Sequence, residues 1–236
     1  MRQRLKALLR AAGWSVGRYD RRSDPAAARK TLFAAMGIDV VLDVGANSGQ
    51  FARQMRGEGY AGRIISFEPL STAYEQLAAA ATGEPSWEIH QCALGNTVGT
   101  AKLNIAGNSW SSSLLPMLEK HRNEAPESAY VGQEEVVVRT LDDVVREYCH
   151  VDEKIFMKVD TQGFTMNVFR GGEGALSAIS GMQVEMSLVP LYAGEPLISD
   201  LLVYLYDRGF KLVYIEPEFW DGSGLQLQVN GLFAKT

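Results

Sequence analysis

Short apolar runs alternate with amphipathic segments along most of the chain, beginning near residue 39. The apolar runs have the length and composition of buried strands, and they lie at residues 40–44, 63–67, 87–91, 155–159 and 182–188. Apolar residues at helical spacing predict helices at residues 50–56, 72–81, 140–148 and 197–207. This alternation is typical of a parallel sheet whose two faces are covered by helices.

The end of the chain departs from the alternation. Two apolar segments, residues 210–215 and 225–234, follow one another without a helix between them. We therefore expect them to pair antiparallel at one edge of the sheet. The predicted fold class is α/β, with a Rossmann-like sheet of seven strands that is mostly parallel, ends in an antiparallel hairpin and carries helices on both faces.

Two further β segments are predicted at residues 100–105 and 135–139. The polar stretch between them, residues 108–115, is too long to be a mere connector. Long loops often carry function, which makes this stretch a candidate functional segment.

Charge is distributed unevenly along the chain. The net charge is −5, but residues 1–30 hold nine Lys and Arg against two Asp, which leaves +7 there and −12 on the remainder. Leu5, Leu8 and Leu9 recur at helical spacing among these basic residues. We predict a basic N-terminal helical segment over residues 1–36 and a single catalytic or ligand-binding domain over residues 37–236. The helix either packs on that domain or makes a peripheral contact with an anionic membrane.

Composition also limits the partners and the compartment. The acidic pI of about 5.3 disfavours a nucleic-acid partner and favours a small or neutral substrate. Cys92 and Cys149 stand apart from each other, which disfavours a zinc site or a disulfide framework. No apolar run has the length of a membrane span or the form of a signal peptide, so a cytoplasmic location is expected. A homo-oligomer is left open.

The first strand is followed by a turn suited to a cationic nucleoside ligand. Asp43, Gly45, Asn47 and Gly49 lie where the strand ends and the helix begins, at the edge where open α/β sheets bind ligands. The glycines let the backbone approach a ligand closely, and Asp43 offers a carboxylate to an ammonium group. The G-A-N-S-G spacing differs from the G-x-G-x-x-G of pyrophosphate sites.

Glu68 ends the second strand, 25 residues after Asp43, and should project at the same sheet edge. A carboxylate at this place can accept both hydroxyls of a ribose. Taken alone, Glu68 fits a nicotinamide cofactor as well as any other nucleoside.

Four motifs together resemble the FkbM family of methyltransferases. They are D-V-G-A-N-S-G-Q-F at residues 43–51, S-F-E-P-L at 66–70, K-V-D-T-Q-G-F at 158–164 and E-M-S-L-V-P-L-Y at 185–192, in the family's order. The resemblance covers residues 38–235 and implies S-adenosylmethionine-dependent O-methylation of sugars, glycolipids, polyketides or related metabolites. It assigns methionine binding to Asp43, Gly45, Asn47 and Gly49, ribose binding to Glu68 beside Pro69, and adenine binding to the turn that holds Cys92, Ala93 and Leu94.

The chain departs from the family pattern at one place and follows it at another. Thr165 stands where the family usually has Glu, so the role of that Glu does not carry over. The serine-rich stretch at residues 111–115 matches a serine–leucine stretch of the family, where it covers the active site. A flexible solvated loop is the alternative interpretation.

An alcohol is a weak nucleophile at neutral pH and needs help to lose its proton. Asp160, at the end of the strand at residues 155–159, is the leading candidate for a general base. Glu185 on the next strand and His121 after the serine loop are the other candidates. Asp160 and Glu185 could instead share a divalent cation, although hard cations usually collect more oxygen ligands. Capping of a turn by Asp160 and an ion pair of Glu185 are the structural alternatives.

Aromatic and hydroxyl side chains form the candidate acceptor site. Trp110, Ser112, Ser113, Tyr192 and Trp220 suit a sugar or polyketide hydroxyl, although buried Trp and Tyr are equally common in cores. A nicotinamide-dependent oxidoreductase and a non-catalytic cofactor-binding protein are the competing functions. Methylation of nucleic acid is disfavoured because the chain has no Asn/Asp-Pro-Pro-aromatic motif.

Overall fold

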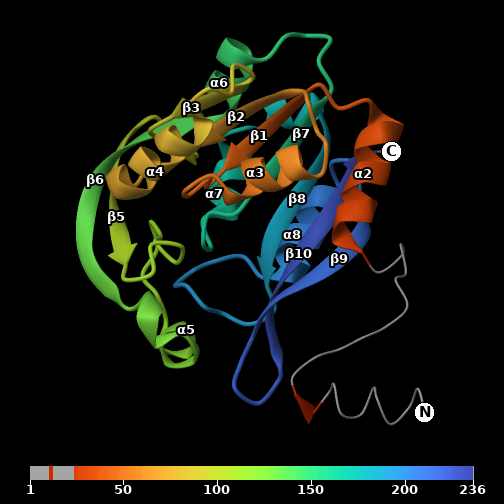
Figure 1. Ribbon diagram of the computed structural model, residues 1–236. Helices are drawn as coiled ribbons and strands as arrows, with labels where there is room; N and C mark the ends of the chain where they lie inside the picture. Colours follow the sequence, from red (N-terminus) through yellow and green to blue (C-terminus); the bar gives the residue numbers. More distant parts are fainter. Residues whose placement is uncertain (1–10, 13–23, 236) are drawn as a thin grey trace.

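The computed structural model describes residues 11–12 and 24–235 (Figure 1). Its main sheet has the strand order β3-β2-β1-β7-β8-β10-β9. The strands are β1 (Val40–Val44), β2 (Arg63–Phe67), β3 (Trp87–His90), β7 (Ile155–Val159), β8 (Ile179–Ser187), β9 (Phe210–Trp220) and β10 (Gln226–Lys235). The first five strands of that order run parallel, whereas β10 pairs antiparallel with both β8 and β9. The predicted fold class is therefore confirmed, including the antiparallel hairpin at the sheet edge.

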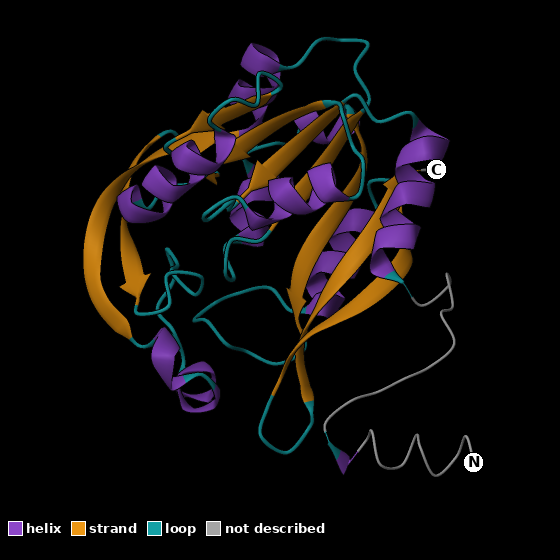
Figure 2. Ribbon diagram, in the orientation of Figure 1, coloured by secondary structure: helices purple, strands orange, loops and turns teal. Residues whose placement is uncertain are grey.

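Helices cover both faces of the sheet (Figure 2). One face packs against α2 (Pro25–Met36), α3 (Gln50–Gly57) and α4 (Ser71–Ala81), and the other against α6 (Leu141–Tyr148), α7 (Thr165–Arg170) and α8 (Ile198–Tyr206). Side-chain alternation along β1 explains this arrangement. Val41 joins the core beneath α3, while Val40 and Leu42 join the opposite core, because successive strand residues point to opposite faces.

A second, three-stranded sheet stands beside the main one. Its order is β4-β6-β5, from β4 (Ala93–Gly95), β5 (Gly99–Ala106) and β6 (Tyr130–Thr140). Figure 1 shows β5 and β6 as a pair of curved strands next to α4, and α5 (Glu119–Glu124) lies in the segment that connects them. The segment expected to be a turn at residues 92–95 is thus the short strand β4, because its backbone pairs with residues 138–140 of β6.

The elements that the pattern did not predict are short. Both α5 and α7 have six residues, too few to show a helical period. By contrast, the predicted helix at residues 140–148 is present as α6, and its first turn is capped by the Thr140 side chain, which accepts the backbone N–H of Asp143.

Helix α2 is tied to the body of the domain through a buried arginine. Arg29 is 3% exposed, and its guanidinium lies 2.6 Å from Glu58 and 3.4 Å from Glu216 on β9. Phe33 of the same helix packs on Phe156 of β7, with ring centroids 4.7 Å apart. The amphipathic helix predicted around Leu5 and Leu9 lies outside the described residues, and the boundary predicted at residue 36 stays a prediction.

Within residues 11–12 and 24–235, no helix combines the length and the apolar character that a membrane span requires.

Candidate functional site

A cavity of about 650 Å³ opens at the carboxyl ends of β1, β2, β7 and β8. This volume lies within the range of roughly 300–1,000 Å³ typical of small-molecule sites. Its wall includes most of the residues predicted for the site, namely Gly45, Asn47, Glu68, Pro69, Cys92, Ala93, Leu94, Trp110, Ser112, Ser113, His121, Asp160 and Glu185. Residues far apart in the sequence thus meet in one place, as expected for the end of a parallel sheet.

The turn between β1 and α3 is built for close approach of neighbouring backbone. Gly45 has a positive φ of 77°, and a Cβ there would overlap the backbone oxygen of Asp160. Gly49, at φ 84°, lies against the Trp87 ring, which a Cβ would approach to 2.8 Å. Both positions therefore require glycine, although Gly49 packs behind the cavity wall and does not line it.

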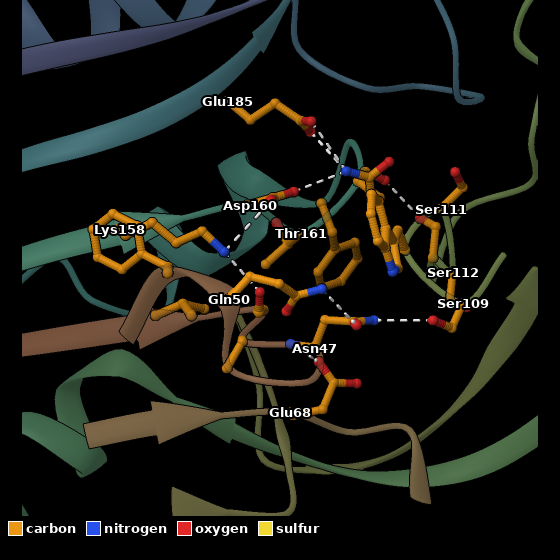
Figure 3. A pocket seen from close by; sticks show the side chains of 18 of the residues that line it. Asn47, Gln50, Glu68, Ser109, Ser111, Ser112, Lys158, Asp160, Thr161 and Glu185 are labelled. Atoms are coloured by element: carbon orange, nitrogen blue, oxygen red, sulfur yellow. Dashed lines mark hydrogen bonds and ion pairs between the residues drawn. The ribbon is translucent and has the colours of Figure 1, made fainter. Parts of the chain in front are cut away.

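Glu68 fastens this turn to β2. One carboxylate oxygen accepts the backbone N–H of Asn47 at 2.8 Å, and the other accepts that of Leu70 at 2.8 Å. Burial raises the pKa of Glu68 to about 7, against the lowering effect of these two hydrogen bonds. The carboxylate lies at the cavity wall with acceptor capacity left on both oxygens (Figure 3).

Asp43 lies behind the wall, not in it. The side chain is fully buried and accepts the Ser66 hydroxyl at 3.1 Å. Lys158, its neighbour on β7, places its ammonium 3.5 Å from the second carboxylate oxygen. Burial raises the pKa of Asp43, and Lys158 opposes that rise. Asp43 therefore does not line the cavity, and it acts on the site through its ion pair with Lys158.

Lys158 is the cation at the centre of the site. Its ammonium donates to the backbone oxygen of Gly45 at 2.7 Å and lies 3.4 Å from the Asp160 carboxylate. Burial alone would lower the pKa of Lys158, but the negative charges of Asp160 and Asp43 raise it overall. Lys158 is therefore charged, and it links the turn after β1 to the end of β7.

Asp160 and Glu185 meet at the far side of the cavity through one amide. The Gln162 side-chain N–H₂ donates to Asp160 at 2.8 Å and to Glu185 at 3.0 Å. Burial and the nearby charge of Asp160 raise the pKa of Glu185 well above its usual value. The two carboxylates differ because Lys158 neutralises Asp160, whereas Glu185 has only the amide as a donor among the described residues.

Gln162 also connects the site to two loops. Its side-chain oxygen accepts the Tyr192 hydroxyl at 2.7 Å, and its backbone oxygen accepts the Ser113 hydroxyl at 2.6 Å. The residue has a positive φ of 48°, which is uncommon for a side chain with a Cβ. Tyr192 is fully buried beneath these contacts, so it supports the cavity without lining it.

The serine loop and His121 form a further part of the wall, next to Tyr192 and Gln162. Trp110 lines the cavity and is 68% exposed, which places it at the mouth, whereas Trp220 is exposed and away from the lining. His121 is 4% exposed, packs edge-on against Tyr192, and its Nδ1 has no hydrogen-bond partner among the described residues. Burial lowers the pKa of His121, so the imidazole is neutral near pH 7.

Lys158 and Gln162 were not predicted from the sequence, although both belong to the K-V-D-T-Q-G motif. A signal for Lys158 was present, because a lysine inside an otherwise apolar strand must find a buried partner. Alternation also places Lys158 and Asp160 on one side of β7. Gln162 gave no such signal, since its role depends on loops that the sequence does not place.

Over the described part of the chain, no three His, Cys, Asp or Glu side chains gather in a way that could hold a metal ion. Thr165, which replaces the Glu of the family pattern, is buried at the start of α7, with its hydroxyl 3.4 Å from that of Thr161. It does not line the cavity.

Comparison with known proteins gives one family and several distant structures. The model of the methyltransferase FkbM domain matches residues 43–212. No curated protein matches the sequence. The structure of a methyltransferase FkbM from Methylobacillus flagellatus KT is similar at 15% identity and a TM-score of 0.49, over 82% of this chain and 43% of that one. This chain therefore spans less than half the length of that protein.

Two other solved structures are similar over most of both chains. One is an rRNA methylase from Streptococcus thermophilus, with 9% identity, a TM-score of 0.47, and coverage of 90% of this chain and 96% of that one. The other is 1,6-didemethyltoxoflavin-N1-methyltransferase from Burkholderia thailandensis with bound S-adenosylhomocysteine, with 13% identity, a TM-score of 0.44, and coverage of 91% and 78%.

Proposed function

This chain belongs to the family of the methyltransferase FkbM domain, and we propose that it transfers a methyl group from S-adenosylmethionine to a hydroxyl of a sugar, glycolipid, polyketide or other small acceptor. The family supplies the reaction class and the donor, in place of the nicotinamide alternative. The acceptor and the roles of individual residues are proposed from the cavity. The observation that best supports this proposal is that the two carboxylates of Asp160 and Glu185 lie across the cavity from Glu68.

The cavity has features that fit the donor. Glu68 keeps acceptor capacity toward the cavity while two backbone N–H groups hold it, and both hydroxyls of a ribose can donate to it. Cys92, Ala93 and Leu94 give a small, largely apolar wall nearby, suited to the face of an adenine. Gly45 and Asn47 are placed to line the methionine part of the donor.

The acceptor hydroxyl is a weak nucleophile, so a side chain of the protein must remove its proton. When S-adenosylmethionine is bound, its methyl group is electrophilic, and the acceptor oxygen forms a C–O bond as the methyl–sulfur bond breaks and leaves its electron pair on sulfur. We assign proton removal to Glu185, because it lines the cavity without an ion-pair partner among the described residues and its pKa is raised above the usual value. Asp160 then holds its charge with Lys158 and keeps the Glu185 pKa high.

This assignment changes the order of the candidates from the sequence. Asp160 was the first choice for the general base, and the proposal moves that role to Glu185. His121 is a neutral base that lines the same cavity, and it remains the second candidate. The third candidate is a divalent cation shared by Asp160 and Glu185. In that case a chelator would abolish activity, and Mg²⁺ or Mn²⁺ would restore it.

The test of the function compares cells with and without the gene. Mass spectrometry of their metabolites and glycolipids should reveal a compound that is lighter by one methyl group in the deleted strain. Purified protein with S-adenosylmethionine should convert that compound to the heavier form, with the new methyl on oxygen. Calorimetric binding of the donor without turnover on any extract would favour the non-catalytic alternative, and labelling of polynucleotide alone would overturn the small acceptor.

A further inference from the structure

One face of the sheet beyond Glu185 is polar where a packed sheet is normally apolar. The side chains that line the cavity there come from alternate positions of three neighbouring antiparallel strands, and they are Gln183 and Glu185 of β8, Gln228 and Asn230 of β10, and Glu216 and Glu218 of β9. Asn230 pairs with Glu185 on one side and with Glu216 on the other. These strands therefore present a continuous polar floor to the cavity.

The floor holds more carboxyl groups than the nearby cations pair with. Lys158 is shared between Asp43 and Asp160, and Arg29 is shared between Glu58 and Glu216. Glu185 and Glu218 have no Lys or Arg within ion-pair distance in the described part of the chain. The donors they do have are the Gln162 amide for Glu185 and the Asn230 amide, at 2.5 Å, for Glu218.

His121, which also lines the cavity, has a buried nitrogen without a hydrogen-bond partner among the described residues. The side chain is more than nine-tenths buried, and the nitrogen is Nδ1. A neutral imidazole offers one acceptor nitrogen. A ligand rich in donors and positive in charge would match the floor and this nitrogen together.

We propose that the acceptor carries a protonated amino group near the hydroxyl that is methylated, as in an amino sugar or an amino alcohol, and that Glu218 with Glu216 binds this ammonium. The proposal rests on the methyltransferase function proposed above. An ammonium has three donors and no acceptor, so it suits a site of carboxylates. A neutral polyol could donate to the same acceptors but would leave Glu218 without a cationic partner.

This chemistry also directs the methyl group to oxygen. A protonated amine has no lone pair, so it cannot attack the donor while carboxylates keep it charged. The adjacent hydroxyl keeps its lone pairs, and Glu185 removes its proton. The carboxylates of the polar floor would therefore select both the substrate and the substrate atom that reacts.

The experiment uses tritiated methyl donor and the small-molecule extract of cells that lack the gene. Half of the extract is treated with acetic anhydride in aqueous bicarbonate, which converts amines to neutral amides and leaves hydroxyls free. We expect purified full-length protein to label the untreated half only. The labelled product should bind a cation exchanger at neutral pH, and its methyl should lie on oxygen.

Two charge variants test the assigned residue. Glu218 is exposed at the rim, so Glu218→Gln and Glu218→Lys should fold normally. The first should raise the KM for the labelled acceptor about tenfold, as expected for loss of one charge-assisted contact, and the second should raise it further. The KM for the donor should change less than about twofold. Glu135→Gln and Glu135→Lys, at an exposed position of β6, are the matched controls and should leave both KM values unchanged.

The outcomes separate this proposal from the function on which it rests. Labelling that survives acetylation, a product that passes the cation exchanger, a methyl on nitrogen, or an unchanged KM in Glu218→Lys would overturn the cationic acceptor and leave the methyltransferase intact. Absence of labelling in both halves, with donor binding preserved, would contradict the proposed catalysis itself.

Discussion

One lysine separates the roles of three carboxylates at the end of the central strands. Asp43 is buried beside Lys158 and closed off from the cavity, and Asp160 shares the same ammonium at 3.4 Å. Glu185 forms no ion pair with Lys158, and its hydrogen-bond donor among the described residues is the Gln162 amide. Because charge and burial set a carboxyl pKa, Glu185 is the group most ready to accept a proton near neutral pH.

Glu185→Gln is therefore expected to lower kcat by about 10²- to 10⁴-fold, the usual contribution of a general base, while donor affinity stays within about twofold. Asp160→Asn should act differently. It removes a charge that raises the Glu185 pKa, so the acid limb of the kcat/KM profile should move to lower pH. If Glu185→Gln retained activity and Asp160→Asn lost the acid limb of the kcat/KM profile, Asp160 would be the general base.

Donor binding should depend on the ionisation of Glu68. Without a ligand, the raised pKa means that the folded state holds this proton more tightly than the unfolded chain, so the contribution to stability is lost as the pH rises through about 7. Ribose hydroxyls prefer the ionised carboxylate, so affinity for S-adenosylmethionine should rise over the same interval. Calorimetry across this pH range measures it, and Glu68→Gln should flatten the profile. If donor affinity in Glu68→Gln depended on pH as it does in the unaltered protein, the titrating group would be another residue.

At the scale of elements, the turn after β1 depends on contact between backbones. Gly45→Ala places a Cβ against the Asp160 oxygen at a positive φ, whereas Gly37→Ala has the same type of φ and open space around it. We expect Gly37→Ala to cost about 1–2 kcal/mol of unfolding free energy from the left-handed conformation alone. Gly45→Ala should cost about 1–3 kcal/mol more, because the overlap forces the ends of β1 and β7 apart. Equal urea midpoints for the two variants would show that the turn after β1 accommodates the Cβ at residue 45 without a further loss of stability.

Elements with a strong period were predictable from the sequence. The limits of β1, β2 and β7 agree with the predicted segments, because fully buried parallel strands form continuous apolar runs. The second sheet was only partly foreseen. Its strand β4 has three residues, and its pairing with β6 joins segments more than forty residues apart, which no local pattern encodes.

The candidate site was predictable where a motif sits at a strand end and unpredictable where loops meet. Gly45, Glu68 and Asp160 lie at the cavity because the carboxyl ends of adjacent parallel strands share one edge. The link from Gln162 to Tyr192 depends on the path of two loops after β7 and β8. The burial of Asp43 behind Lys158 likewise needs the register of β1 and β7, which pairs these two residues directly.

At the scale of the whole molecule, the cavity ties distant parts of the chain into one unit. Its wall runs from Arg29 on α2 to Asn230 on β10 and includes both sheets. A ligand that binds only this native arrangement should therefore stabilise the entire fold. At a donor concentration one hundred times its Kd, the expected gain is about 2.7 kcal/mol, which corresponds to a rise in Tm of roughly 5–10 °C for a domain of this size.

Thermal unfolding with and without S-adenosylmethionine tests this coupling. We expect one transition in both cases, moved upward as a whole by the donor, because no part of the wall can unfold without opening the site. Glu68→Ala removes a ribose acceptor and should weaken binding by about 1–3 kcal/mol, so the same donor concentration should produce a much smaller rise. Two resolved transitions, of which the donor moves only one, would show that the two sheets unfold independently, and an undiminished rise in Glu68→Ala would place the donor away from β2.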